Sequence, residues 1–307
     1  MNKRCREVNL KNYKKLSEDM RNLFINHAAQ NPGFHLSSSL GLVETSIALL
    51  NVINNENVKI LFDIGHQRYP FLVVEHYMRT GELKIPDKEI QHDIFLHPTF
   101  AGLSTALAAG AAVSTNNKVF ALIGDGAFTS GEIYEGLNLL GELDANIAIV
   151  HNQNNMSIRE NVGVFKDSDI LKSFVNCFGF NFLEVSDGHN IKNLINAFRI
   201  ALESKKKVFI NIKTIKGKGY FPSENNPLEF HQPFMGFNVQ SGEFYKPEGM
   251  ILQFFECYVL FEKFLYNLLE KDNNVYLVFP STPPFQSLIK QYPERVIDTG
   301  ITEQLYL

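Results

Sequence analysis

The stretch that decides the fold class is residues 118–158, KVFALIGDGAFTSGEIYEGLNLLGELDANIAIVHNQNNMSI. Residues 119–123 form an apolar run, which predicts a buried parallel strand. A helix is expected over residues 130–143, because leucine and isoleucine recur there between glutamates. A second strand is expected over residues 146–150. Strand, helix and strand in this order are the repeating unit of a doubly wound α/β sheet.

Polar side chains follow both of these strands at the point where each one ends. Asp125, between Gly124 and Gly126, follows the first strand, and Asn154 comes 29 residues later after the second. In an open α/β sheet, ligands bind at the carboxyl ends of the strands. Carboxylate and amide oxygens are hard ligands that suit Mg²⁺ or Ca²⁺, and a diphosphate could supply the further anionic oxygens that the ion needs.

A simpler interpretation of the same residues is available. Gly-Asp-Gly is often a plain turn, and asparagines often cap helices. Considered alone, these short motifs favour that interpretation. The complete order of strand, Gly-Asp-Gly, helix, strand and asparagine cluster favours the metal and diphosphate site instead.

The composition excludes several classes of protein. The net charge is −4 and the charged fraction is 20 %, so neither nucleic acid nor an anionic membrane surface is an expected partner. The three cysteines are scattered, without metal spacing or a disulfide framework. The basic first fifteen residues lead into no apolar signal core. We therefore expect a cytoplasmic protein.

Helical and strand patterns alternate along the rest of the first 250 residues. They predict a doubly wound, mostly parallel sheet with helices on both faces. Helices are expected over residues 10–29, 42–51, 103–114 and 190–203, and strands over 59–64, 181–186 and 207–213. Residues 34–41 are interpreted as a serine-rich loop, and residues 213–231 as a long glycine-punctuated functional loop.

Residues 251–307 are predicted to begin a second, incomplete α/β unit, and residues 1–250 to form the first domain. Strands are expected over residues 275–279 and from residue 296, and a helix over residues 283–291. Another helix carries a stripe of apolar residues, namely Phe261, Phe264, Leu265, Leu268 and Leu269. Two strands do not close a sheet, so their unpaired edges invite pairing with another chain.

Three histidines lie in Gly-, Ser- or Pro-rich segments rather than on a helix face. They are His35, His66 and His231. Any single histidine is more often structural than catalytic. His35 and His66 are nevertheless expected on the same side of the sheet as Asp125, where imidazoles could bind phosphate or transfer protons near neutral pH. We interpret His76, His92 and His189 as surface or capping residues.

Several motifs together resemble the 1-deoxy-D-xylulose-5-phosphate synthase family, thiamine-diphosphate enzymes related to transketolase. In chain order they are FHLSSSLGLVE, DIGHQRYP, GDGAFTSGEIYEGLN, NQNNMSIRENVG, SDGH, KGKGYFPSENNPLEFH and DTGITEQ. The resemblance extends from about residue 16 to residue 304. In one respect the chain departs from the family: the loop over residues 97–102, HPTFAG, looks closer to that of transketolases.

The resemblance implies a role for each matching residue. Asp125, Asn154 and the main-chain carbonyl of Met156 would hold Mg²⁺. The cofactor would also be contacted by Gly124, Gly126, Ala127 and His66. His35, His66 and His231 match active-site histidines of the family. Glu303 matches the glutamate that hydrogen-bonds N1′ of the aminopyrimidine and so activates the cofactor.

The implied reaction converts pyruvate and glyceraldehyde 3-phosphate to 1-deoxyxylulose 5-phosphate and CO₂. The substrates would be small molecules, a 2-oxo acid or a sugar phosphate. The chain is expected to act in a homo-oligomer, or in a hetero-oligomer with a chain that carries the family's other domains. Two alternatives remain open: the N-terminal subunit of a split transketolase, and a truncated homologue that binds cofactor or partner without turnover.

Overall fold

The computed structural model describes residues 12–54, 56–86, 94–95, 101–282 and 285–302. Within them the larger sheet has six strands in the order β2-β1-β3-β4-β6-β5, and all of its strand pairs are parallel. Its strands are β1 (Val58–Phe62), β2 (Ile94–Phe95), β3 (Lys118–Gly124), β4 (Ile147–Gln153), β5 (Asn181–Val185) and β6 (Val208–Lys213). The parallel arrangement confirms the predicted fold class.

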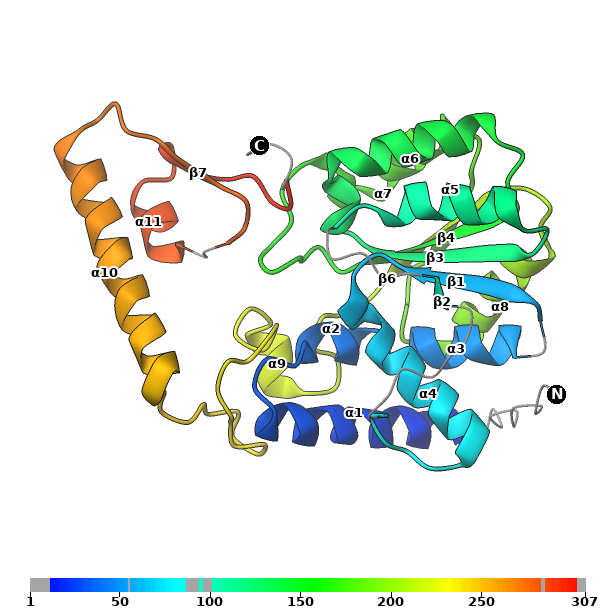
Figure 1. Ribbon diagram of the computed structural model, residues 1–307, viewed down its shortest axis with the longest axis horizontal. Coiled ribbons are helices and arrows are strands. Elements are labelled where there is room, and N and C mark those ends of the chain that lie inside the picture. Colours follow the sequence, from blue (N-terminus) through cyan, green and yellow to red (C-terminus); the bar gives the residue numbers. More distant parts are fainter. Residues whose placement is uncertain (1–11, 55, 87–93, 96–100, 283–284, 303–307) are drawn as a thin grey trace.

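Helices cover both faces of this sheet (Figure 1). One face carries α5 (Ser104–Ser114), α6 (Gly131–Glu142) and α7 (Ser168–Asn176). The other face carries α1 (Tyr13–Gln30), α3 (Val43–Ile53), α4 (Tyr69–Thr80) and α8 (Ile191–Glu203).

Side chains alternate between these two layers along each central strand. On β3, Phe120 and Leu122 join the apolar cluster on the α1 side, whereas Val119, Ala121 and Ile123 join the cluster on the α5 side. Because a strand that is buried on both faces needs apolar residues at every position, β3 reads as a continuous apolar run. The predicted burial of this strand is therefore confirmed.

Several short elements were not predicted. The serine-rich segment that we interpreted as a loop contains a helix, α2 (Leu36–Gly41), and that interpretation was wrong. Burial of Leu36 and Leu40 in the core overrides the weak helix propensity of serine there. The other elements that were not predicted are β2, α4, α7, the helix α9 (Phe221–Asn225) and the 3₁₀ turns η2 (Gly65–Arg68), η3 (Ala127–Thr129) and η4 (Val164–Lys166).

A second, two-stranded parallel sheet lies in the C-terminal part. It pairs β7 (Leu277–Phe279) with β8 (Val296–Asp298), next to α10 (Gly249–Lys271) and α11 (Gln286–Gln291). The strands and helices expected here are present. The domain boundary between residues 250 and 251 stays a prediction.

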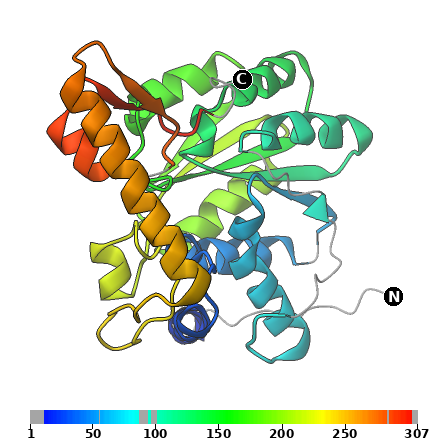
Figure 2. The ribbon, with the colours of Figure 1, turned by 60° about the vertical axis from the view of Figure 1, so that its left-hand side comes forward.

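The apolar stripe predicted on α10 was only partly right. Leu265 and Leu269 are buried against β7, β8 and α11. Phe261, Phe264 and Leu268, however, are 50 %, 59 % and 37 % exposed. The helix α10 is long and lies at the margin of the molecule in Figure 1, and Figure 2 shows it (orange) crossing the near side. It therefore buries a narrower face than its sequence pattern indicates. Among the described helices, none is both long and apolar enough to cross a bilayer.

Candidate functional site

The carboxyl ends of β3 and β4 bring Asp125 and Asn154 together. The strands run in register, with Gly124 opposite Asn152. The Asp125 Oδ2 atom accepts the backbone N–H groups of Asn154, at 2.8 Å, and Asn155, at 2.5 Å. Its Oδ1 atom accepts the N–H of Gly126 at 2.9 Å. Three main-chain donors from two strand ends therefore fix the orientation of this carboxylate.

Asp125 is a buried carboxylate whose charge is costly. Burial raises its pKa to about 6, although hydrogen bonds from Asn161, Asn154 and Asn155 and the charge of Lys216 oppose that rise. A cation close to the carboxylate would favour its ionised form. The geometry therefore presents a carboxylate that a cation would stabilise.

The loop after β4 closes over Gly126. A Cβ atom at Gly126 would lie 2.4 Å from the Cβ of Ser157, so only glycine fits here. In the same loop Asn155 adopts a positive φ of 60°, which asparagine tolerates better than most residues. The Oδ1 atom of Asn154 accepts the N–H of Met156 at 3.0 Å. This bond holds Asn154 and Met156 in one tight turn, and their role as metal ligands stays a prediction.

The three histidines singled out from the sequence form one cluster. The rings of His35 and His66 stack with centroids 4.1 Å apart and an interplanar angle of 1°. The ring of His231 stands edge-on to both, at 5.2 Å from His35 and 6.1 Å from His66. His35 precedes α2, His66 lies in η2 after β1, and His231 follows α9. Three distant segments therefore meet at one point.

Burial keeps these imidazoles neutral. It lowers the pKa of His35 to about 4 and that of His231 to about 2, and it holds the pKa of His66 well below its usual range. The positive charge of Lys216 lowers all three further, and neighbouring imidazoles add to the effect on His66 and His231. The Nδ1 atom of His231 is buried and has no hydrogen-bond partner among the described residues.

Lys216 is the residue at this site that our sequence reasoning missed. It lies after β6 and is only 5 % exposed. Its ammonium donates a hydrogen bond to the Ser157 carbonyl. Burial lowers the pKa of Lys216 to about 8, and the charge of Asp125 opposes this change. The motif KGKGY, in which a glycine follows each of two lysines, could have indicated it.

Glu303 lies outside the described residues. So do residues 97–100 of the loop before α5. The described end of that loop is held by Asp63, which follows β1. The Asp63 carboxylate accepts the backbone N–H groups of Gly102, at 3.0 Å, and Ser104, at 3.0 Å. Burial raises the pKa of Asp63.

His189 was wrongly interpreted as a surface or capping residue. Its side chain is 13 % exposed, and its Nδ1 atom lies 3.0 Å from Oε2 of Glu44. Its Nε2 atom accepts the backbone N–H of Ile215 at 2.9 Å. His189 therefore connects α3 to the loop that carries Lys216.

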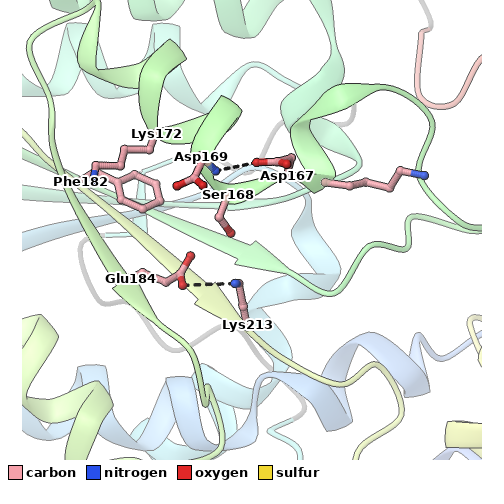
Figure 3. A pocket seen from close by; sticks show the side chains of 8 residues that line it. Asp167, Ser168, Asp169, Lys172, Phe182, Glu184 and Lys213 are labelled. Carbon is pink, nitrogen blue, oxygen red and sulfur yellow. Dashed lines mark hydrogen bonds and ion pairs between the residues drawn. The ribbon is translucent and has the colours of Figure 1, made fainter.

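A cavity of about 510 Å³ lies elsewhere, next to β5, β6 and the start of α7 (Figure 3). An ion pair of 3.2 Å between Lys213 and Glu184 crosses it, and Asp167 caps α7 at its rim. Its lining residues are Lys166, Asp167, Ser168, Asp169, Lys172, Phe182, Glu184 and Lys213, none of which belongs to the histidine cluster or contacts Asp125. We therefore do not place the chemistry in this cavity.

Comparisons with known proteins find similar sequences over most of the chain. The family model described as 1-deoxy-D-xylulose-5-phosphate synthase matches residues 1–176. The 1-deoxy-D-xylulose-5-phosphate synthase of Methylobacillus flagellatus is 30 % identical over 97 % of this chain and 57 % of its own length. The 1-deoxy-D-xylulose-5-phosphate synthase 2 of Geobacter sulfurreducens is 31 % identical over 94 % of this chain and 55 % of its own length. The chain thus spans about half the length of these curated relatives.

Solved structures show the same fold at lower identity. Transketolase from Campylobacter jejuni superposes with a TM-score of 0.57 at 23 % identity, covering 74 % of this chain and 41 % of that one. Transketolase from Leishmania mexicana gives a TM-score of 0.50 at 17 % identity, covering 68 % and 37 %. These similarities support the α/β architecture.

Proposed function

This chain belongs to the 1-deoxy-D-xylulose-5-phosphate synthase family, and we propose that its sheet-end site binds thiamine diphosphate through Mg²⁺. The single observation that carries the proposal is the arrangement of Asp125, Asn154 and Lys216. One buried carboxylate, an amide and a buried ammonium meet where β3 and β4 end. A divalent cation and a diphosphate are complementary to that set of charges.

The donor atoms at the site fit Mg²⁺. A carboxylate offers about four lone-pair positions: three of those of Asp125 accept backbone N–H groups, and a cation would take the position that the Asn161 side chain occupies here. The Asn154 Oδ1 accepts one hydrogen bond and keeps a second lone pair. The Oδ1 atom of Asn161 is buried and has no partner among the described residues. We assign the metal to Asp125, Asn154 and the carbonyl of Met156.

The surroundings also fit an anion. The ammonium of Lys216 is buried near the ion site, where a diphosphate would compensate its charge. Gly124 ends β3, Gly126 lies in the turn that follows and Ala127 begins η3, so the main chain can come close to a bound group there. We place the cofactor's diphosphate against this turn, with His66 beside it.

The chain's own catalytic groups would be the three histidines and Glu303. Neutral imidazoles can accept a proton or donate one to an oxygen, and their mutual contacts hold His35, His66 and His231 in fixed positions. Thiamine diphosphate supplies an electron sink for carbon–carbon bond cleavage when it is bound. We assign Glu303 the hydrogen bond to the aminopyrimidine.

For the complete enzyme we propose the reaction of the family. Pyruvate loses CO₂, and its two-carbon unit is transferred to glyceraldehyde 3-phosphate to give 1-deoxyxylulose 5-phosphate. Membership of the family supports this reaction. The remaining length of the family's proteins, on this polypeptide or on another, is part of the proposed enzyme.

Product analysis tests this function. The protein, with the remaining family length present, is incubated with thiamine diphosphate, Mg²⁺, pyruvate labelled with ¹³C and glyceraldehyde 3-phosphate. We expect labelled 1-deoxyxylulose 5-phosphate in the NMR spectrum, and a loss of roughly 10²-fold or more in rate for Glu303→Gln. Ketol transfer between sugar phosphates without consumption of pyruvate would contradict the proposal and favour a transketolase.

A further inference from the structure

The loop that carries Lys216 needs an external support. Residues 214–220 follow β6 and belong to no helix or strand, so their backbone is not fixed by a ladder of hydrogen bonds. The loop's amides are partly satisfied by turns, and the N–H of Gly217 donates to the Ser37 carbonyl at 2.9 Å. Gly217 and Gly219 adopt positive φ values of 80° and 83°. An irregular, glycine-containing backbone can place a lysine accurately only if its neighbours are held.

Two side chains hold the backbone on either side of Lys216. On one side, Nε2 of His189 accepts the N–H of Ile215 at 2.9 Å. On the other side, Nε of Arg21 donates to the carbonyl of Lys218 at 2.8 Å. Arg21 lies on α1, and His189 lies just before α8. The two supports therefore come from segments that are far apart in the sequence.

Glu44 joins these two supports through one oxygen atom. Its Oε2 atom accepts Nη2 of Arg21 at 2.7 Å and Nδ1–H of His189 at 3.0 Å. Because Nε2 of His189 already accepts the Ile215 amide, the ring's proton belongs on Nδ1. We call Arg21, Glu44 and His189 the Glu44 clamp.

The clamp is charged and buried. The side chains of Arg21, Glu44 and His189 are 11 %, 8 % and 13 % exposed. Burial alone raises the pKa of Glu44, but hydrogen bonds from His189 and Arg21 lower it to about 2. Glu44 therefore remains ionised. The loop also packs directly on the clamp, because a Cβ at Gly219 would lie 2.5 Å from Cδ of Arg21.

We propose that the Glu44 clamp is a positioning device for Lys216: it fixes the backbone of residues 215–218 so that the ammonium reaches the diphosphate. This inference rests on the proposed function, because it requires a diphosphate beside Lys216. The three clamp residues act through the loop. A clamp that served only to stabilise the fold would affect binding independently of the lysine, and this difference can be measured.

A double-mutant cycle separates the two possibilities. The probe is inorganic diphosphate with Mg²⁺, and its affinity is measured by calorimetry. His189→Phe keeps an aromatic ring but removes the acceptor for Ile215. We expect it to weaken binding roughly tenfold in the wild-type background, and by no more than about twofold when Lys216 is already methionine. Glu184→Gln, which removes a carboxylate at the same end of the sheet, is the control and should leave affinity unchanged.

Amide hydrogen exchange of the ligand-free protein supplies a readout that is independent of ligand. In His189→Phe the Gly217 amide should exchange roughly tenfold faster, while amides of β4 keep their protection. Arg21→Lys, which keeps the charge but loses the second donor, should act in the same direction if the phenylalanine variant fails to fold. An unchanged exchange rate at the Gly217 amide would overturn the proposal. So would a double variant whose loss of affinity equals the product of the losses in the His189 and Lys216 single variants. A wild-type protein that binds no diphosphate, despite a protected loop, would overturn the proposed function and the role of the clamp with it.

Discussion

The sheet-end site around Asp125 and Lys216 buries charged groups, whereas the C-terminal unit, formed by α10, β7, α11 and β8, exposes large apolar side chains. At the sheet-end site Asp125 and Lys216 are buried, and His35, His66 and His231 are half-buried. In the C-terminal unit, the buried cluster contains six apolar residues, and α10 exposes large apolar side chains such as Phe261 and Phe264. Burial of polar groups at the site lowers the stability of the fold, whereas the C-terminal unit leaves apolar surface exposed to solvent.

This difference indicates which region carries the chemistry. Buried charges and neutral histidines do not help a chain to fold, because transfer of a charge out of water costs free energy. The two large apolar clusters on either face of the six-stranded sheet can offset that cost. Groups that are retained at a cost in a well-packed region are functional candidates.

The two regions meet at the loop that also carries Asn154. Arg159, in that loop, donates to Oδ2 of Asp298 at 2.9 Å. Asp298 also accepts the N–H groups of Ser281 and Gly300, and Ile301 packs against the apolar cluster on the α5 side. Asp298 and Ile301 therefore attach the end of the described chain to the loop after β4 and to the α5 side of the large sheet.

The largest expected effect concerns the histidines. Ala replacement of His35 or His231 should lower turnover of the complete enzyme by roughly 10²–10⁴-fold, because a proton-transfer group is lost. The melting temperature should change little. His76→Ala is the control, because the side chain of His76 is 14 % exposed and lies beside Glu82, away from the histidine cluster. A large drop in melting temperature with full activity would identify the cluster as ordinary core and remove the contrast between the two regions.

The next effect concerns the buried ammonium. Lys216→Met should weaken thiamine diphosphate binding by roughly 30-fold or more, because the loss of a buried charge partner typically costs 2–5 kcal/mol. Lys213→Met, at an ion pair whose lysine side chain is 42 % exposed, should change affinity less than about threefold. Calorimetric titration compares the two variants. Equal effects would show that Lys216 does not face the ligand.

Between pH 5 and 7.5 the pH dependence of stability should come mainly from histidines, and all nine of them lie within residues 1–231. In the folded chain His35, His66, His231 and His151 have lowered pKa values, so below pH 6.5 the unfolded chain binds more protons. Stability should therefore fall as pH drops from about 7.5 to 5, by about 2 kcal/mol for each histidine that stays neutral. Asp125, whose pKa is raised to about 6, takes up a proton in the folded chain over this range and offsets part of the fall.

Urea unfolding at the two pH values measures this effect. His151→Phe removes one buried imidazole. The difference in unfolding free energy between the two pH values should therefore be smaller by about 2 kcal/mol in this variant. Stability that is constant over this range would mean that the imidazoles are solvated or paired with acids.

The smallest effect belongs to the exposed face of α10. Phe264→Ser should change the unfolding free energy by less than about 0.5 kcal/mol, because this side chain is 59 % exposed. Leu269→Ala, on the buried face, should cost roughly 2–5 kcal/mol. Chemical denaturation compares them. A large cost for Phe264→Ser would show that this face is covered in solution.

Much of the fold could be predicted because its strands and helices carry simple patterns. The apolar run of β3 and the periodic pattern of α8 indicated their elements almost to the residue. α2 was missed because its serines have weak helix propensity and tertiary burial decides the matter. The apolar stripe on α10 was predicted too wide, because periodicity indicates which residues share a face but not how much of that face is covered.

The site could be predicted where its residues occupy strand ends or recognisable motifs. Asp125 and Asn154 are examples, and the structure also brings His35, His66 and His231 together. The catalytic and metal-binding roles of these residues stay predictions. The Glu44 clamp was not predictable, because its contacts join residues separated by 145 and 197 positions. Such contacts leave no local pattern in the sequence.

The most direct test of the central claim is a calorimetric titration of thiamine diphosphate, with and without Mg²⁺, into the wild-type protein and Asp125→Ala. Unchanged circular dichroism of the variant would establish that it is folded. We predict tight binding to the wild type with Mg²⁺, and affinity at least about a hundredfold lower without Mg²⁺ or without the carboxylate, because a direct ligand to the ion is lost. Equal affinity in the variant, or binding that is indifferent to Mg²⁺, would contradict the assignment of the diphosphate and its ion to Asp125.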